Sequence, residues 1–144
     1  MARRILAAIA LLSLILLPAP AALAQDRGPF SVTAHPTLGN ILADTNGMTL
    51  YTWAGDAAGS NLSACADACA TAWPPYLVAE DMARSLMMSP RAGAIEGTHQ
   101  VTLDGWPLYH FVRDTAPGDA NGDGVNAFGA RWSVVKADDM MMMM

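Results

Sequence analysis

The sequence predicts a mainly β fold, in which two tandem antiparallel hairpin units, with short helical connectors, form one small domain. The stretch NGMTLYTWAGD, residues 46–56, returns in altered form as DGWPLYHFVRD, residues 104–114. Each copy begins with Asn-Gly or Asp-Gly between apolar-rich runs, which is the strongest short-range signal for a β-hairpin. Two related hairpins in one chain therefore define the expected architecture.

The first 24 residues are typical of a secretory signal peptide. Arg3 and Arg4 precede an apolar run over residues 5–17, and Ala22-Leu23-Ala24 supplies a cleavage site. The run is too short to span a bilayer. We therefore expect an exported protein, periplasmic or secreted, with no transmembrane span. No cysteine lies near the cleavage site, so there is no lipobox for lipid attachment.

Length and charge limit the classes of partner. Without the signal peptide about 120 residues remain, enough for one small domain with a modest core. The formal net charge of −5 becomes −7, because Arg3 and Arg4 leave while all 13 acidic residues stay. An acidic chain argues against nucleic acid and anionic membrane as partners. The expected partner is an unidentified envelope protein or a small ligand.

The repeats also divide the mature chain into segments. The connector between the repeats shows helical spacing at Met82 and Leu86 and is ended by Pro90. The expected segments are a linker over 25–37, a two-repeat β domain over 38–136 (repeat 1, 38–79; connector, 80–97; repeat 2, 98–136) and a disordered Met-rich tail over 137–144.

The two hairpins are predicted from their turns, because a two-residue type I′ turn needs positive φ at both central positions. Pro107 cannot donate to a ladder, so its amide position should face an edge or a bulge. The paired segments are 40–45 with 48–53, and 99–103 with 106–112.

Aromatic side chains recur at equivalent positions of the two copies. Alternation along a strand places Tyr51 and Trp53 on one face, and Tyr109 and Phe111 on the matching face of the second copy. Aromatic residues on strands mostly fill interiors, so we expect a shared core rather than a binding platform. Further along, Trp73 and Trp132 also fall at nearly equivalent positions.

An acid follows each aromatic strand. Asp56 and Asp114 precede Gly-containing loops, where a carboxylate can accept loop amides. Each copy offers one such acid and no partnered base, which favours a turn-forming role over catalysis.

Cys65 and Cys69 are the two cysteines of the chain. In an exported protein a disulfide is the default state. A c-type haem site needs C-x-x-C-H and a redox motif usually has C-x-x-C, and neither spacing is present.

Several motifs occur together in order. Y-x-[FWY]-x-x-D stands at residues 51–56 and 109–114, C-x-x-x-C is followed by W-P-P at 73–75, and P-G-D at 117–119 is followed by Trp132. On these motifs the chain, over roughly residues 38–136, resembles the secreted-repeat family of bacterial predicted lipoproteins. The resemblance implies an exported envelope protein and no established reaction.

Residues 119–126, DANGDGVN, copy the opening of a calcium-binding loop. Asp119, Asn121 and Asp123 are the candidate ligands. In an EF-hand register the twelfth position is Ala130, where a bidentate Glu is needed. An ordinary Gly/Asn/Asp turn is therefore the competing interpretation.

A copper or zinc site is a second candidate. The register of the second hairpin places His99 opposite His110, with Cβ atoms about 4.5–5.5 Å apart. Two ligands do not complete a site, so a partly exposed histidine pair is the competing interpretation. The methionine run at 140–144 offers soft ligands for Cu(I), but it lacks a spaced geometry and is expected to be disordered.

The sequence gives little support for an enzyme. No serine stands in a nucleophile elbow, and no Gly-rich phosphate loop precedes a helix. The leading hypothesis is an exported non-enzymatic cell-envelope protein, a binding or structural module that requires no cofactor. The rival is a periplasmic metal-handling or redox-accessory protein that uses His99, His110 and methionines.

Overall fold

The computed structural model describes residues 28–138 and confirms a mainly β chain. The expected signal peptide and residues 139–144 of the expected tail lie outside the described residues, whereas Ala137 is fully buried. The elements, in chain order, are β1 Ser31–His35, β2 Gly39–Ala43, β3 Tyr51–Trp53, α1 Ala68–Ala72, α2 Glu80–Leu86, β4 Ala92–Ala94, β5 Val101–Leu103, β6 Trp106–Pro107, β7 Asn126–Ala127 and β8 Ala130–Val134.

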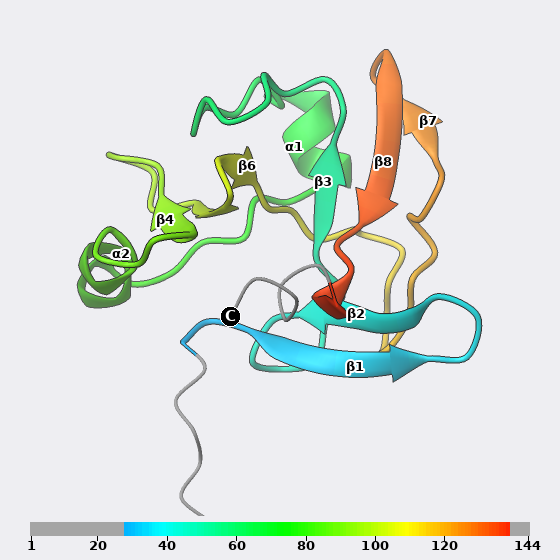
Figure 1. Ribbon diagram of the computed structural model, residues 1–144. Helices are drawn as coiled ribbons and strands as arrows, with labels where there is room; N and C mark the ends of the chain where they lie inside the picture. Colours follow the sequence, from blue (N-terminus) through cyan, green and yellow to red (C-terminus); the bar gives the residue numbers. More distant parts are fainter. Residues whose placement is uncertain (1–27, 139–144) are drawn as a thin grey trace, which may run out of the picture.

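The segment expected as a linker, 25–37, contains a strand. β1 pairs antiparallel with β2, and the two form a ribbon across the base of the molecule (Figure 1). The turn between them is held by His35 Nδ1, which accepts the amides of Thr37 at 3.3 Å and Leu38 at 3.2 Å. The linker prediction missed this strand because Val32 is its one large apolar residue, so the sequence pattern is weak.

The first hairpin has a different register from the one predicted. The Asp44 amide donates to the Met48 carbonyl at 2.9 Å, so the loop holds three residues instead of two. Gly47, at φ +84°, closes it. Asp44 Oδ1 accepts the amides of Asn46 at 2.8 Å and Met48 at 3.0 Å, which stabilises a type I turn followed by a left-handed glycine.

The second hairpin keeps the predicted turn. Leu103 pairs with Trp106, and Asp104 and Gly105 have φ of +50° and +80°, as a type I′ turn requires. β4 lies on the other side of β5, so the sheet order is β4-β5-β6. Arg91, just before β4, donates from Nε to Asp104 Oδ1 at 2.8 Å and braces this turn.

The chain that follows Trp73 in repeat 1, and the chain that follows Trp132 in repeat 2, each cross to the other repeat. In repeat 1 the Tyr76 amide donates to the Leu108 carbonyl at 2.9 Å, within the second hairpin. In repeat 2 the Val135 amide donates to the Leu50 carbonyl at 3.2 Å, within the first hairpin. β8 accordingly lies beside β3 (Figure 1). The hairpin of each repeat is thus extended by a segment of the other.

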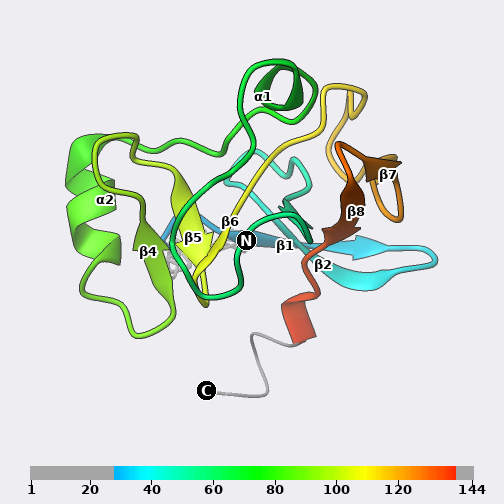
Figure 2. The same ribbon diagram turned by 90° about the horizontal axis from the view of Figure 1, so that it is seen from above.

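The interior consists of two clusters. Seen from above, α2 and the β4-β5-β6 sheet lie on one side, and β7 and β8 lie on the other (Figure 2). One cluster is largely aliphatic: Phe30, Leu42, Leu50, Tyr76, Leu86, Val101, Leu103 and Leu108. The other is largely aromatic: Ile41, Tyr51, Trp53, Cys69, Trp73, Tyr109, Trp132 and Val134. The aromatic cluster contains most of the motif residues.

Candidate functional site

The two copies of the motif meet at their tyrosines. The Tyr51 amide donates to the Tyr109 carbonyl at 2.9 Å, and the Tyr109 amide donates to the Tyr51 carbonyl at 3.0 Å. Equivalent residues of the two repeats therefore face each other, and the repeats are related by a pseudo-two-fold axis at this point.

Each tyrosine hydroxyl donates a hydrogen bond to the acid of the opposite motif copy. Tyr51 Oη donates to Asp114 Oδ2 at 2.6 Å, and Tyr109 Oη donates to Asp56 Oδ2 at 2.7 Å. All four side chains are buried. The motif thus joins repeat 1 to repeat 2 through two exchanged tyrosine–carboxylate hydrogen bonds.

The second carboxylate oxygen of each acid accepts a hydrogen bond from a main-chain amide in the loop that follows the acid. Asp56 Oδ1 accepts the Ala64 amide at 2.8 Å, and Asp114 Oδ1 accepts the Asn121 amide at 3.0 Å. Each carboxylate therefore has a loop partner on one oxygen and the other repeat's tyrosine on the other. Ser63 Oγ, 2.7 Å from Tyr109 Oη, completes one of the two networks.

Burial sets the protonation of these groups. Removal from water, together with the hydrogen bond to Asp114, holds the pKa of Tyr51 well above its usual range. Burial likewise raises the pKa of Tyr109. Burial also raises the pKa of Asp56, while the Ala64 amide and the Tyr109 hydroxyl oppose this rise. Both phenols therefore remain proton donors near neutral pH, which does not suit a general base.

Four aromatic rings stack in a row beside the tyrosines. Phe111 lies on Trp73 with ring centroids 4.1 Å apart, and Trp73 lies on Trp132 at 3.9 Å with an interplanar angle of 1°. Trp132 is followed by Trp53 at 5.5 Å. The rings come alternately from the two repeats. The stack is therefore a second set of contacts that joins the repeats across the pseudo-two-fold axis.

The stack obeys the same symmetry as the hydrogen bonds. Tyr51 meets Trp73 edge-on at 5.4 Å, and Tyr109 meets Trp132 edge-on at 5.1 Å. Gly122 lies so close that an added Cβ would be 2.6 Å from the Trp73 ring. The sequence predicted a shared aromatic core, but it did not predict a continuous stack.

The structure confirms the disulfide between Cys65 and Cys69, whose Cα atoms are 5.3 Å apart. Cys69 lies in α1 and is buried in the aromatic cluster. The crosslink therefore shapes the loop that leads into Trp73.

The three candidate calcium ligands have separate partners. Asp119 Oδ2 accepts the amides of Thr115 at 2.9 Å and Ala116 at 3.0 Å, and these bonds lower the pKa of the carboxyl. Asp123 Oδ1 accepts the Val134 amide at 3.0 Å. The side-chain nitrogen of the third, Asn121, donates to the Asp114 carboxylate at 3.1 Å. A calcium site here stays a prediction that would compete with these bonds.

His99 and His110 do not lie opposite each other in one β-ladder, contrary to the register predicted for the second hairpin. Beyond Val101 and Leu108 the strands separate, because Tyr109 pairs with Tyr51. His110 Nε2 lies 3.0 Å from Asp44 Oδ2 instead.

His99 has φ +60°, and its carbonyl accepts the Val78 amide at 3.2 Å. Within residues 28–138 no group of three or more His, Cys, Asp or Glu is arranged to hold a metal ion. A copper or zinc site at His99 and His110 remains a prediction. Sequence reasoning missed Asp44, because nothing local links it to His110, 66 residues away.

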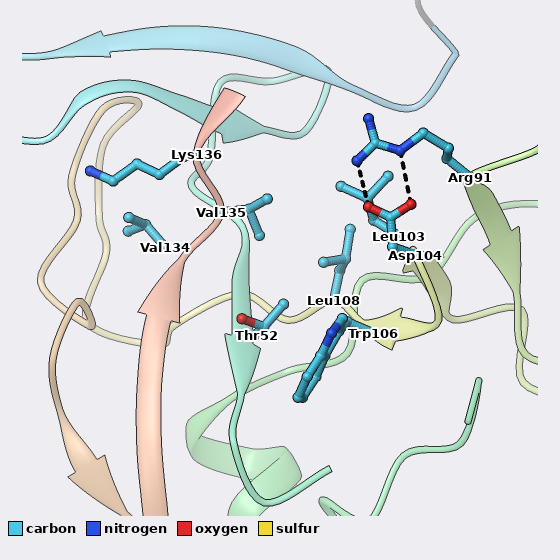
Figure 3. A pocket seen from close by; sticks show the side chains of 9 residues that line it. All are labelled: Thr52, Arg91, Leu103, Asp104, Trp106, Leu108, Val134, Val135 and Lys136. Atoms are coloured by element: carbon cyan, nitrogen blue, oxygen red, sulfur yellow. Dashed lines mark hydrogen bonds and ion pairs between the residues drawn. The ribbon is translucent and has the colours of Figure 1, made fainter. Parts of the chain in front are cut away.

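A small hollow of about 220 Å³ lies where the two repeats meet (Figure 3). Two hydrogen bonds join Arg91 to Asp104 at one side of it, and Lys136 lies on the opposite side (Figure 3). Lys136 Nζ donates to the Leu38 carbonyl. The charged groups of this hollow are therefore engaged within the protein.

A larger hollow, of about 620 Å³, lies at the outer end of the aromatic stack. We call it the end hollow. Its lining combines aromatic, aliphatic and polar residues: Ala72, Trp73, Phe111, Val112, Arg113, Asn121, Val125, Ala127 and Phe128.

These features define a class of protein: a two-repeat β module whose copies are joined by exchanged tyrosine–carboxylate bonds. The chain belongs to the family described as a secreted repeat of unknown function, whose model matches residues 32–76 and 94–136. No curated protein and no solved structure matches the chain. The resemblance read from the motifs is confirmed, and the first match starts inside β1. Within the described residues, no helix is long and apolar enough to cross a membrane.

Proposed function

We propose that the chain is an exported, non-enzymatic binding module of the cell envelope, in which the repeated motif is the scaffold. The observation that carries this proposal is the exchange of hydrogen bonds. Tyr51 bonds Asp114 and Tyr109 bonds Asp56, so the groups that a catalyst would use are bonded to each other.

Burial supports the scaffold role. A catalytic acid or base must come within hydrogen-bond reach of its substrate. Asp56 and Asp114 are 4% and 8% exposed, and each has a partner on both carboxylate oxygens. Because the motif tyrosines and acids are hydrogen-bonded to each other inside the protein, recognition falls to residues that the two copies do not share.

Export is part of the same proposal. The family is described as secreted, and the Cys65–Cys69 disulfide fits an oxidising compartment. Fractionation of the native host should find the oxidised protein in the periplasm or the medium, with residue 25 at its N-terminus. Recovery with two free thiols from the cytoplasm would contradict export.

A comparison of binding with turnover tests the non-enzymatic role. Mature protein is incubated with an envelope extract, and bound and altered compounds are identified by mass spectrometry. We expect retained compounds, unchanged in mass, that raise the melting temperature of the wild type and of Asp56→Asn alike. Asp104→Asn, at an exposed acid, is the matched control. A product formed by the wild type but not by folded Asp56→Asn would overturn the proposal.

A further inference from the structure

We propose that the end hollow binds a small planar aromatic carboxylate. This inference rests on the proposed function, since it names the class of ligand that the binding module would take. Four observations carry it: the end of the aromatic stack, a strained exposed phenylalanine, an arginine that forms no ion pair among residues 28–138, and the size of the hollow.

The first observation is the open end of the stack. Phe111 is the last ring of the row and lines the end hollow, with Trp73 behind it. At the opposite end, the main chain at Gly55 lies against Trp53, since an added Cβ would be 2.3 Å from that indole. A planar ring that enters the end hollow can extend the stack beyond Phe111, in the arrangement that aromatic pairs favour.

The second observation is Phe128, at the tip of the β7–β8 hairpin. It has φ +56°, which a bulky residue rarely adopts, and its side chain is 47% exposed. Phe128 and Gly129 occupy the central positions of a two-residue turn, where Asn-Gly is the favoured pair. A strained residue with a half-exposed apolar side chain contributes little to the fold, and such strain is concentrated at binding sites.

The third observation is the charge of the lining. Arg113 lines the end hollow, and none of the other lining residues among the described part of the chain is acidic. In the part of the chain that the structure describes, Arg84 and Arg91 pair with carboxylates, whereas Arg113 forms no ion pair. A guanidinium binds a carboxylate through two parallel hydrogen bonds, so a planar anion suits this position.

The fourth observation is size. The end hollow, at about 620 Å³, is within the range of small-molecule sites, roughly 300–1,000 Å³. The hollow in Figure 3 has about 220 Å³, and both of its cations are engaged by protein acceptors. Of these two hollows, the end hollow alone combines room for a ring with an arginine that forms no ion pair among the described residues.

The test uses 2-naphthoate and its uncharged analogue 2-naphthamide as probes of the mature protein. Binding is followed by quenching of tryptophan fluorescence and by calorimetry. We expect saturable binding of 2-naphthoate, and binding of 2-naphthamide that is about tenfold weaker, because the amide lacks the charge that Arg113 pairs with.

Two variants separate the ring contact from the charge contact. Phe128→Ala should weaken binding of both probes by about tenfold, through loss of an aromatic wall. Arg113→Gln should weaken binding of 2-naphthoate alone by about tenfold. Leu62→Ala, at another exposed apolar residue, and Arg131→Gln, at another arginine without an ion pair among residues 28–138, should leave both affinities unchanged. Thermal melts verify that each variant is folded.

Three results would overturn the inference: no saturation by 2-naphthoate, equal losses for both probes in Arg113→Gln, or a dimer that Phe128→Ala abolishes. The last result would make the end hollow a contact between copies of this chain. Chemical conversion of the bound probe would instead overturn the proposed function and leave the site intact. Failure of the wild-type protein to bind would overturn the site and leave the proposed function.

Discussion

The exchanged hydrogen bonds predict a specific loss of stability in Tyr109→Phe. The hydroxyl donates to Asp56 Oδ2 at 2.7 Å, and both residues are less than 5% exposed. A hydrogen bond to a charged acceptor contributes roughly 1.5–3 kcal/mol, and its loss leaves a buried oxygen without this donor. We expect the free energy of unfolding to fall by about 2–3 kcal/mol, which lowers the melting temperature by roughly 10 °C in a domain of this size.

A double-mutant cycle in urea, followed by tryptophan fluorescence, locates the partner of each tyrosine. Tyr109→Phe combined with Asp56→Asn should show a coupling of about 1–2 kcal/mol. Tyr109→Phe combined with Asp114→Asn, the acid of its own motif copy, should be additive within about 0.5 kcal/mol. Tyr76→Phe is the control, since its hydroxyl donates to the Pro29 carbonyl at 2.6 Å and not to a carboxylate. It should cost only about 1 kcal/mol.

The exchanged pairing of Tyr109 with Asp56 is refuted if the larger coupling joins Tyr109 to Asp114. That result would mean that each motif copy closes on itself. It is also refuted if Tyr109→Phe costs no more than Tyr76→Phe, because the exchanged bond would then add nothing to an ordinary buried hydroxyl contact.

Three further predictions concern the same core. Reduction of the Cys65–Cys69 disulfide should lower stability by about 2 kcal/mol, since the closed loop is short, and urea titrations with and without reductant measure this; equal midpoints would contradict it. Burial raises the pKa of Asp56, so the folded state holds this proton more tightly than the unfolded state. The contribution of Asp56 to stability should be greatest below its unfolded pKa and decline as pH rises through the raised value. Asp56→Asn should lack that decline in urea titrations at successive pH values, and parallel profiles would rule it out. Gly122→Ala would place a Cβ 2.6 Å from Trp73, and should cost about 1–3 kcal/mol in a urea titration; a loss below about 0.5 kcal/mol would show that the stack can shift.

Local features of the fold were predictable from the sequence. The turn at Asp104-Gly105 follows from the φ preference of its residues, and the Cys65–Cys69 disulfide follows from spacing and export. The first hairpin differs from the predicted register by one residue, because the Asp44 carboxylate accepts two loop amides and selects a longer turn than Asn-Gly would. The hydrogen bonds accepted by one side chain, that of Asp44, therefore select the register of this hairpin.

The exchange of tyrosine–carboxylate hydrogen bonds between the repeats could not be predicted from local sequence patterns. Tyr51 and Asp56 are five positions apart in one copy of the motif. In the structure Tyr51 bonds Asp114, 63 residues away. Sequence repetition predicts two similar units, but not that each unit satisfies the buried groups of the other. The motifs do not point to Arg113 or Phe128, because Arg113 stands at an unspecified position of its motif and Phe128 lies outside the motifs. Neither residue has a counterpart of the same type in repeat 1.

The exchange also explains how one motif can be present twice while the ligand site is present once. A single repeat would leave its tyrosine without an acid and its hairpin without the crossing segment, so the copies depend on each other. Residues outside the exchanged bonds carry no such dependence and can diverge. At equivalent positions next to the two ends of the stack, repeat 1 has Gly55, packed against Trp53, and repeat 2 has Arg113, which lines the end hollow. One end of a symmetric core is thereby closed, and the other is free to meet a ligand.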